Sequence, residues 1–399
     1  MRIGMILMTR FPPDIRVEKE VGTLRSKHEV FLLCPRRKGQ LADESCRGAQ
    51  VCRVFTSATR SWNLWSLLAT CRSKGWERSI AEFVRSRQID VLHVHDLPLL
   101  GPALAAAKEL NVPVVADLHE NYPAMLAENK RIPFYRTTSL GGLISRLSVS
   151  VRRWEFFERI TVPKADQVIV VIEEARDRLV ALGVSAERIH VVGNYTSADE
   201  PAGNEPSRDK DTTGLRLIYA GGFDSTRDLR TVIQAVAQLP AQQFEKLEVV
   251  LLGGVGHSLR LLSDYASSSG VADRVSVRAW MPLKDVEGII ATADVGLVPH
   301  VKSPHTDATI PHKLFQYMWH QLPVIVSDCA PLARIVNESG CGLVYESGNA
   351  ESLASCIAEL YRNPNQARTM GVAGKRAVRA KYNWETAAQV LSNLYQGIK

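Results

Sequence analysis

The stretch DATIPHKLFQYMWHQLPVIVSD, residues 307–328, decides the fold of this 399-residue chain. Pro311 suits the first turn of a helix, where its missing N–H is not needed, and apolar residues then recur at helical spacing. These residues are Leu314, Phe315, Met318 and Trp319. Leu322-Pro323 ends the helix, and the β-branched run 324–326 indicates a buried parallel strand. The stretch therefore predicts a helix followed by a strand of a parallel sheet.

The start of this helix also predicts an anion site. The first N–H groups of a helix are unpaired and lie at the positive end of its dipole. Lys313 lies in the first turn and adds a full positive charge. A phosphate group is the expected ligand, whereas the alternative is an ordinary αβ unit with a solvated lysine. Spacing alone leaves both interpretations open.

Length and composition indicate a globular protein of two domains. A chain of 399 residues with 45% hydrophobic side chains is too long for a single core. Its longest apolar runs, 167–172 and 247–252, are far shorter than the roughly 18 residues of a membrane span. The start MRIGMILMTRFPP is unlike a signal peptide, which predicts a cytoplasmic protein. Seven cysteines without a CxxC pair favour reduced thiols over disulfides or a zinc site.

The net positive charge of the chain arises from its first half. Lys and Arg outnumber Asp and Glu by 29 to 21 in residues 1–195, whereas residues 196–399 hold 20 against 21. Much of the excess lies in residues 130–164, where basic and apolar residues interleave. The basic residues are Lys130, Arg131, Arg136, Arg146, Arg152, Arg153, Arg159 and Lys164, and the apolar ones include Leu140, Leu143, Ile144, Leu147, Trp154, Phe156 and Phe157.

Segment 130–164 is typical of a basic amphipathic surface that binds an anionic membrane. The alternative is a solvated basic helix packed on its own domain. Nucleic acid is a less favoured partner, because no recognition motif accompanies the charge. The segment therefore predicts a cytoplasmic protein that binds the inner face of the cell membrane peripherally.

The first half alternates between strand-like and helical patterns. Strands are expected at 2–8, 29–34, 90–94, 112–118, 168–171 and 189–192, and helices at 17–25, 64–87, 102–110 and 173–182. This order predicts a parallel α/β sheet, which binds ligands at the carboxyl ends of its strands. Two strands end in polar clusters, namely His93, His95 and Asp96, and His119, Glu120 and Asn121. His119 is the favoured ligand-contacting histidine.

Residues 196–214, TSADEPAGNEPSRDKDTTG, predict a flexible linker between the domains. Beyond it the alternation resumes, with strands expected at 215–220, 247–252, 275–278 and 295–298 and helices at 229–239, 286–292 and 384–398. The Gly221-Gly222 turn lets backbone approach a diphosphate closely, and Arg227 supplies charge before the next helix.

Several stretches together carry a family resemblance. FPPDIRVEKEVGTL, VLHVHDLPLLGPAL, VADLHENYP, ADQVIVV, YAGGFDSTRDLRTVIQAV and IPHKLFQYMWHQLPVIVSD follow one another in the order found in glycosyltransferase family 4. The chain resembles in particular the bacterial branch that builds surface polysaccharides and glycolipids.

This resemblance implies a GT-B fold, in which two Rossmann-like domains face an interdomain cleft. Residues 1–195 would bind the acceptor, residues 215–380 the donor, and residues 381–399 would form a helix that returns to the first domain. It also implies a hexosyltransferase that retains anomeric configuration and uses no metal or other cofactor. Its substrates would be a nucleotide sugar, linked to UDP or GDP, and a glycan or lipid-linked acceptor.

The resemblance also assigns roles to residues. Gly221 and Arg227 match the donor diphosphate turn, in which Gly222 occupies the place of the usual arginine, and Lys313 with Leu314 matches the second diphosphate and ribose contact. His119 matches the histidine that closes over the donor sugar. Arg16 lies where many members have a glycine pair, and its side chain would replace their backbone contacts to the donor. His119, Arg227 and Lys313 are therefore the expected catalytic residues.

The chain departs from the family at its glutamate pair. Ala308 and Gln316 occupy the two glutamate positions, and Gln321 replaces the glycine that usually follows the helix. Gln316 can still hydrogen-bond a ribose, more weakly than a carboxylate, and Asp307 is the expected substitute for the first glutamate. A left-handed Gln321 would cost about 1 kcal/mol. These departures leave two alternatives open, a silent GT-B partner subunit that binds nucleotide sugar and a nucleotide-sugar epimerase.

Overall fold

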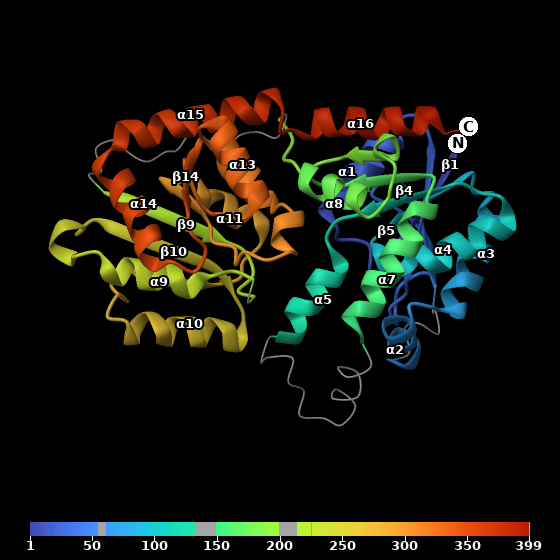
Figure 1. The fold of residues 1–399 in the computed structure, drawn as a ribbon, viewed down its shortest axis with the longest axis horizontal. Coiled ribbons are helices and arrows are strands. Elements are labelled where there is room, and N and C mark those ends of the chain that lie inside the picture. Colours follow the sequence, from blue (N-terminus) through green and yellow to red (C-terminus); the bar gives the residue numbers. More distant parts are fainter. Residues whose placement is uncertain (55–60, 132–148, 199–213, 225, 399) are drawn as a thin grey trace. The chain divides into compact units, whose positions relative to one another are not determined.

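The computed structural model describes residues 1–54, 61–131, 149–198, 214–224 and 226–398. Most of the predicted linker and residues 132–148 of segment 130–164 lie outside these ranges. The chain forms two compact units. The first unit holds Met1–Gly193 and Ala387–Lys399, and the second holds Asn194–Thr386. Each unit contains one sheet flanked by helices (Figure 1).

The first unit has an eight-stranded sheet with the order β3-β4-β2-β1-β5-β6-β7-β8. Its strands are β1 (Arg2–Ile6), β2 (Glu29–Pro35), β3 (Asp43–Cys46), β4 (Ala49–Val54), β5 (Val91–His95), β6 (Val114–Leu118), β7 (Gln167–Val170) and β8 (Ile189–Val191). All neighbours pair in parallel except β3 and β4. The β3–β4 hairpin was absent from the sequence prediction, because β3 is short and polar and carries no apolar alternation.

The helices of the first unit are α1 (Ile15–Leu24), α2 (Ser61–Thr70), α3 (Lys74–Arg87), α4 (Leu97–Leu110), α5 (Tyr122–Arg131), α7 (Val151–Thr161) and α8 (Glu173–Ala181). The single helix predicted at 64–87 is wrong, since it is two helices. Ser73 begins the second by accepting a hydrogen bond from Trp76 N, and Cys71 before it has a positive φ. The last helix, α16 (Trp384–Gly397), joins the first unit from Ala387 onward.

The second unit has a six-stranded parallel sheet with the order β11-β10-β9-β12-β13-β14. Its strands are β9 (Leu215–Ala220), β10 (Leu247–Gly254), β11 (Val275–Ala279), β12 (Val295–Val298), β13 (Val324–Ser327) and β14 (Gly342–Tyr345). Its helices are α9 (Leu229–Gln238), α10 (Gly256–Ser268), α11 (Leu283–Ile290), α12 (His312–Trp319), α13 (Ala330–Ser339), α14 (Ala350–Arg362) and α15 (Pro364–Ala380). This is the doubly wound order, whose direction reverses between β9 and β12, and such reversals are where these sheets bind ligands.

The deciding stretch forms the predicted helix and strand. Pro311 precedes α12, and β13 follows it between β12 and β14. The four apolar side chains at helical spacing, Leu314, Phe315, Met318 and Trp319, are all buried. Burial of this stripe, about 1.5–3 kcal/mol for each large side chain, stabilises the helix against its sheet.

Gln321, just after α12, has a φ of +57° and so adopts the left-handed conformation considered above. Its carbonyl oxygen lies so close to Gly371 that a Cβ there would overlap it. We expect Gln321→Gly to raise the free energy of unfolding by about 0.5–1 kcal/mol, because glycine removes the strain at some cost in chain entropy. Urea unfolding measures this, and an equal loss of stability would contradict it.

None of the helices in the described ranges has the length and apolar composition needed to cross a membrane. In α7, which lies in the described part of segment 130–164, Trp154 is fully buried and its Nε1 donates to Leu68 O at 2.9 Å. Phe156 and Ile160 are exposed. One face of α7 therefore packs on its own unit and the other faces solvent.

Candidate active site

In the second unit, glycines bring the ends of β9 and β10 together. A Cβ on Gly253 would lie 2.2 Å from Gly221 O, so only glycine permits this approach. The turn after β9 is fixed by two hydrogen bonds. Tyr219 OH donates to Gly222 O at 2.7 Å, and Ala220 N donates to Tyr317 OH at 2.8 Å. The predicted Gly221-Gly222 turn is thus a rigid, closely packed corner.

Lys313 reaches this corner from the first turn of α12. Its Nζ lies 3.8 Å from the centre of the Tyr219 ring, and a side chain on Gly221 would collide with it. Burial and the nearby Arg227 hold the pKa of Lys313 well below its usual range. The lysine is therefore packed against aromatic and backbone groups where a negative partner would restore its charge.

Arg227 lies in the same corner, one residue before the N-cap of α9. Its Nη1 donates to His300 Nε2 at 2.7 Å, and His300 is buried just beyond the end of β12. Burial, Arg227 and Lys313 together keep the pKa of His300 well below its ordinary value, so the ring is neutral and accepts this bond. His300 thus fixes the Arg227 side chain. The sequence prediction did not include His300, although a polar residue directly after an apolar strand was a usable signal.

Arg227 and Lys313 therefore converge at the point where the strand order reverses, between β9 and β12. A positive charge on either side chain disfavours one on the other, and a ligand of charge −2 would favour both. The arrangement can bind a diphosphate and stabilise negative charge that develops on it.

We expect the binding of a nucleoside diphosphate here to be accompanied by uptake of a proton from solution at Lys313. Burial and Arg227 lower the pKa of Lys313 and bound anionic oxygens would raise it, so the site should hold more protons with the nucleotide bound than without it. Calorimetry at pH 8 in buffers of different ionisation enthalpy should give a binding enthalpy that increases with buffer enthalpy. Lys313→Met should abolish this slope, and a slope of zero in the unaltered protein would contradict the assignment.

The other donor residues predicted in this unit are placed differently. The Leu314 side chain is fully buried in the core, so only its backbone is available to a ligand. Asp307 Oδ1 accepts from Ala330 N at 2.7 Å and caps the start of α13. Gln316 is half-buried on α12, and Ala308 is buried. The donor contacts of Asp307, Leu314, Gln316, Gly221 and Gly222 stay predictions.

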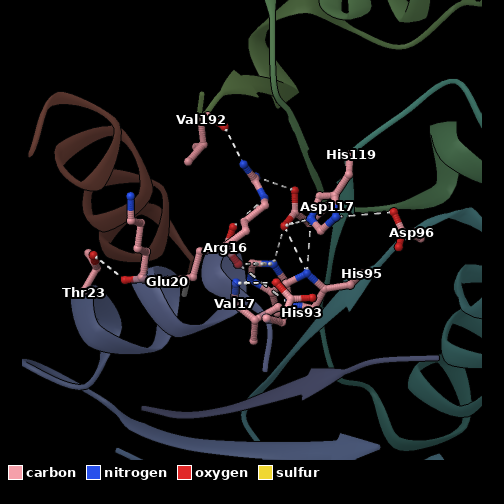
Figure 2. A network of polar contacts seen from close by, with 12 residues as sticks. Arg16, Val17, Glu20, Thr23, His93, His95, Asp96, Asp117, His119 and Val192 are labelled. Carbon is pink, nitrogen blue, oxygen red and sulfur yellow. Dashed lines mark hydrogen bonds and ion pairs between the residues drawn. The ribbon is translucent and has the colours of Figure 1, made fainter. Parts of the chain in front are cut away.

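In the first unit, Arg16 and Asp117 form a buried ion pair at the carboxyl ends of β1, β5 and β6 (Figure 2). Arg16 Nη2 lies 2.9 Å from Asp117 Oδ1, Nη1 donates to Val192 O at 3.0 Å, and Nε lies 3.0 Å from Glu20 Oε1. Although burial opposes ionisation of Asp117, Arg16 and His119 hold its pKa well below the usual range. The guanidinium is thus committed within its own unit, and the donor contact of Arg16 stays a prediction.

His119 lies beside this pair with carboxylates at both ring nitrogens. Nε2 is 2.9 Å from Asp117 Oδ2, and Nδ1 is 3.5 Å from Asp96 Oδ1. Burial opposes protonation of the ring, but the two carboxylates outweigh it and raise the pKa of His119 to about 9. His119 is therefore a cation at neutral pH and a donor at both nitrogens, and it is about a quarter exposed. The two predicted polar clusters meet here, since His95 Nδ1 is 3.4 Å from His119 Nε2.

Glu20, His93, His95 and Asp117 are the described residues whose potential metal-ligand atoms gather within 4.8 Å. The Arg16 guanidinium lies against both carboxylates and already compensates their charge. We therefore treat this group as a network of hydrogen bonds and ion pairs. Independence of metal stays a prediction.

The fold defines the class of the protein. Sucrose-phosphate synthase from Thermosynechococcus elongatus superimposes with a TM-score of 0.73 at 17% identity, covering 99% of this chain and 98% of that one. Anabaena HepE in complex with UDP-glucose superimposes with a TM-score of 0.68 at 13% identity, covering 99% of both chains. Together with the two doubly wound units, these similarities confirm the GT-B fold.

Sequence comparisons then define the family. The model described as Glycosyltransferase Family 4 matches residues 21–200, and the model described as Glycosyl transferases group 1 matches residues 204–377. The chain belongs to the family 4 type of glycosyltransferase, enzymes that act on sugar donors in synthesis of the polysaccharide and glycolipid type.

Named relatives are similar over most of this chain. The MMP alpha-(1->4)-mannosyltransferase of Mycolicibacterium hassiacum is 22% identical over 326 residues, covering 79% of this chain and 73% of its own length. The alpha-maltose-1-phosphate synthase of Mycolicibacterium smegmatis is 24% identical over 438 residues, covering the whole of both chains.

Proposed function

We propose that this enzyme transfers a sugar from a UDP- or GDP-linked donor to a glycan or lipid-linked acceptor, with retention of configuration and without a metal. The observation that carries the proposal is the convergence of Arg227 and Lys313 at the switch point of the second unit. The UDP-glucose bound by HepE supports the donor class, and the mannosyltransferase relative supports a hexosyl group.

The proposed chemistry is stabilisation of the leaving group. As the bond between sugar and phosphate breaks, negative charge builds on the diphosphate, and Arg227 and Lys313 are already in place to receive it. His300 holds Arg227 in position, so little reorganisation is needed during the reaction. The acceptor would attack from the face that the diphosphate leaves, which retains configuration.

A panel of nucleotide sugars and acceptors tests this function. Release of nucleoside diphosphate together with a new glycoside of retained configuration, undiminished by a chelator, supports it. Tight binding without turnover supports the silent-partner alternative, which the buried Ala308 at a glutamate position favours. Conversion of one nucleotide sugar into another would support epimerisation. The first outcome is the expected one.

We also propose that α7 brings the enzyme to an anionic membrane surface where lipid-linked acceptors lie. Its outward face carries Phe156, 53% exposed, and Ile160, 41% exposed, next to the basic Arg152 and Arg159. The Arg159 guanidinium lies 5.7 Å from the centre of the Phe156 ring. Basic residues beside exposed apolar ones are typical of peripheral binding. Salt-dependent flotation with anionic vesicles tests this, and no flotation at low salt would refute it.

A further inference from the structure

The network around Asp117 extends to a tyrosine near the end of the chain. Tyr395 lies in α16 and is fully buried, and its hydroxyl oxygen is 2.6 Å from His93 Nδ1. The two rings lie nearly parallel, at an interplanar angle of 11°. A residue of the last helix thus bonds to a histidine of β5, the strand next to β6.

The hydrogen bonds from Tyr395 to His93 and from His93 to Asp117 can be assigned one direction, because the Asp117 carboxylate accepts. Burial, Glu20 and Asp117 hold the pKa of Tyr395 well above its ordinary value, so the phenol keeps its proton and can donate a hydrogen bond to His93 Nδ1. An imidazole that accepts at Nδ1 carries its proton on Nε2. That nitrogen lies 3.3 Å from Asp117 Oδ2, so His93 donates to the carboxylate.

Asp117 in turn contacts His119. The same Oδ2 atom accepts from His119 Nε2 at 2.9 Å and contacts His95 Nδ1 at 3.2 Å, while Oδ1 is held by Arg16. Figure 2 shows these contacts converging on Asp117 from α1, β5 and the end of β6. Asp117 is therefore held by Arg16, His93 and His95 in addition to its contact with His119.

The second carboxylate beside His119, that of Asp96, belongs to a residue with a strained backbone. Asp96 has φ 64° and ψ 155°, a strained conformation that residues other than glycine rarely adopt. Its N donates to Asp117 O at 2.8 Å, and its side chain leaves the start of α4 without a cap. The carboxylate lies against His119 Nδ1 instead. Strain maintained at this point indicates a functional geometry.

We infer that Tyr395, His93 and Asp117 form a hydrogen-bonded line that fixes the orientation and positive charge of His119. Tyr395 and Asp117 are then positioning residues for the histidine expected to contact the donor sugar. The link to catalysis rests on the proposed function, whereas the line itself does not. With both N–H groups facing carboxylates, the immobilised ring would present a fixed positive charge to sugar or phosphate oxygens without reorganisation.

The charges around His119 favour the cation. From α1 it faces Arg16 and Glu20, from β5 and the following loop His95 and Asp96, and from its own segment Asp117 and Glu120. Burial, mainly, holds the pKa of His95 at about 3, so that ring is neutral, and it holds the pKa of Glu20 well above its usual value. Arg16 then opposes the cation while Asp117 and Asp96 support it. Removal of the Asp117 charge must lower the pKa of His119.

The test is an NMR titration of His119 in the full-length protein without ligand, assigned by comparison with His119→Gln. The unaltered protein should titrate near pH 9. Asp117→Asn should move the midpoint down by about 1–3 units, because a close opposite charge is lost. Tyr395→Phe should move it down by about half a unit, because one hydrogen bond in the line is lost.

Tyr382→Phe is the matched control. Tyr382 is equally buried, and its hydroxyl donates to Glu338 at 3.0 Å, away from the network. It should leave the His119 titration unchanged. The inference fails if Tyr395→Phe behaves like Tyr382→Phe, or if His119 titrates near its ordinary value in the unaltered protein. This readout needs no substrate. If the midpoints shift as expected but the enzyme shows no transfer activity, the proposed function is refuted and the hydrogen-bonded line is not.

Discussion

Lys313→Ala and Arg227→Ala are each expected to reduce the rate of sugar transfer about 10²–10³-fold while the protein stays folded. Both side chains converge on one corner, where they are positioned to meet the charge that develops on the departing diphosphate. Because this interaction strengthens in the transition state, the turnover number should fall more than the apparent affinity for the donor. Steady-state kinetics with the donor found in the panel measures both values.

Two control variants match these changes within the same unit. Lys302→Ala removes an exposed lysine paired with Asp328 at 2.8 Å, and Arg230→Ala removes an exposed arginine packed on Tyr265. Both should keep nearly normal turnover. Near-normal rates in Lys313→Ala and Arg227→Ala, with circular dichroism unchanged, would remove the leaving-group account. An equally large loss in the controls would show that the effect is not specific to the corner.

The second large effect concerns stability. Arg16→Ala should lower the free energy of unfolding by about 3–5 kcal/mol, because it leaves the buried carboxylate of Asp117 without its cation and Glu20 without its partner. Urea unfolding at pH 7 measures it. Arg47→Ala is the control, since the exposed Arg47 in the turn between β3 and β4 pairs with Glu18 of α1 at 3.5 Å and its loss should cost less than about 1 kcal/mol.

The pH dependence of the Arg16 effect has a defined sign. The folded-state pKa of Asp117 is depressed, so its ionised form stabilises the protein at neutral pH. That contribution is lost as pH falls below about 3.9, the ordinary pKa, toward the folded value. The difference in free energy of unfolding between Arg16→Ala and the unaltered protein should therefore become smaller at acidic pH. A stable variant that binds nucleotide poorly would instead favour the predicted donor contact of Arg16.

The fold was largely predictable from hydrophobic pattern. β9 and β12 begin and end at the predicted residues, since short β-branched runs bounded by turn residues have one interpretation in an αβ alternation. The β3–β4 hairpin escaped prediction because its first strand is polar and gains its structure only from pairing with β4. The break at Cys71 to Ser73 also escaped, because apolar residues continue on both sides of it.

Arg227 and Lys313 were found from the sequence because their charges follow a strand or begin a helix, and their catalytic role stays a prediction. The site was not predictable where function depends on distant partners. Asp117 lies inside the apolar run of β6, and Tyr395 is one of several apolar positions on α16, so neither carries a local signal. Their roles arise from packing between residues 278 positions apart in the chain, which periodicity cannot reveal.

A crystal structure with bound UDP or GDP tests the central claim most directly. The account predicts diphosphate oxygens within hydrogen-bonding distance of both Lys313 Nζ and the Arg227 guanidinium, beside the Gly221 corner. A nucleotide bound elsewhere, or one whose phosphates contact neither side chain, would contradict it.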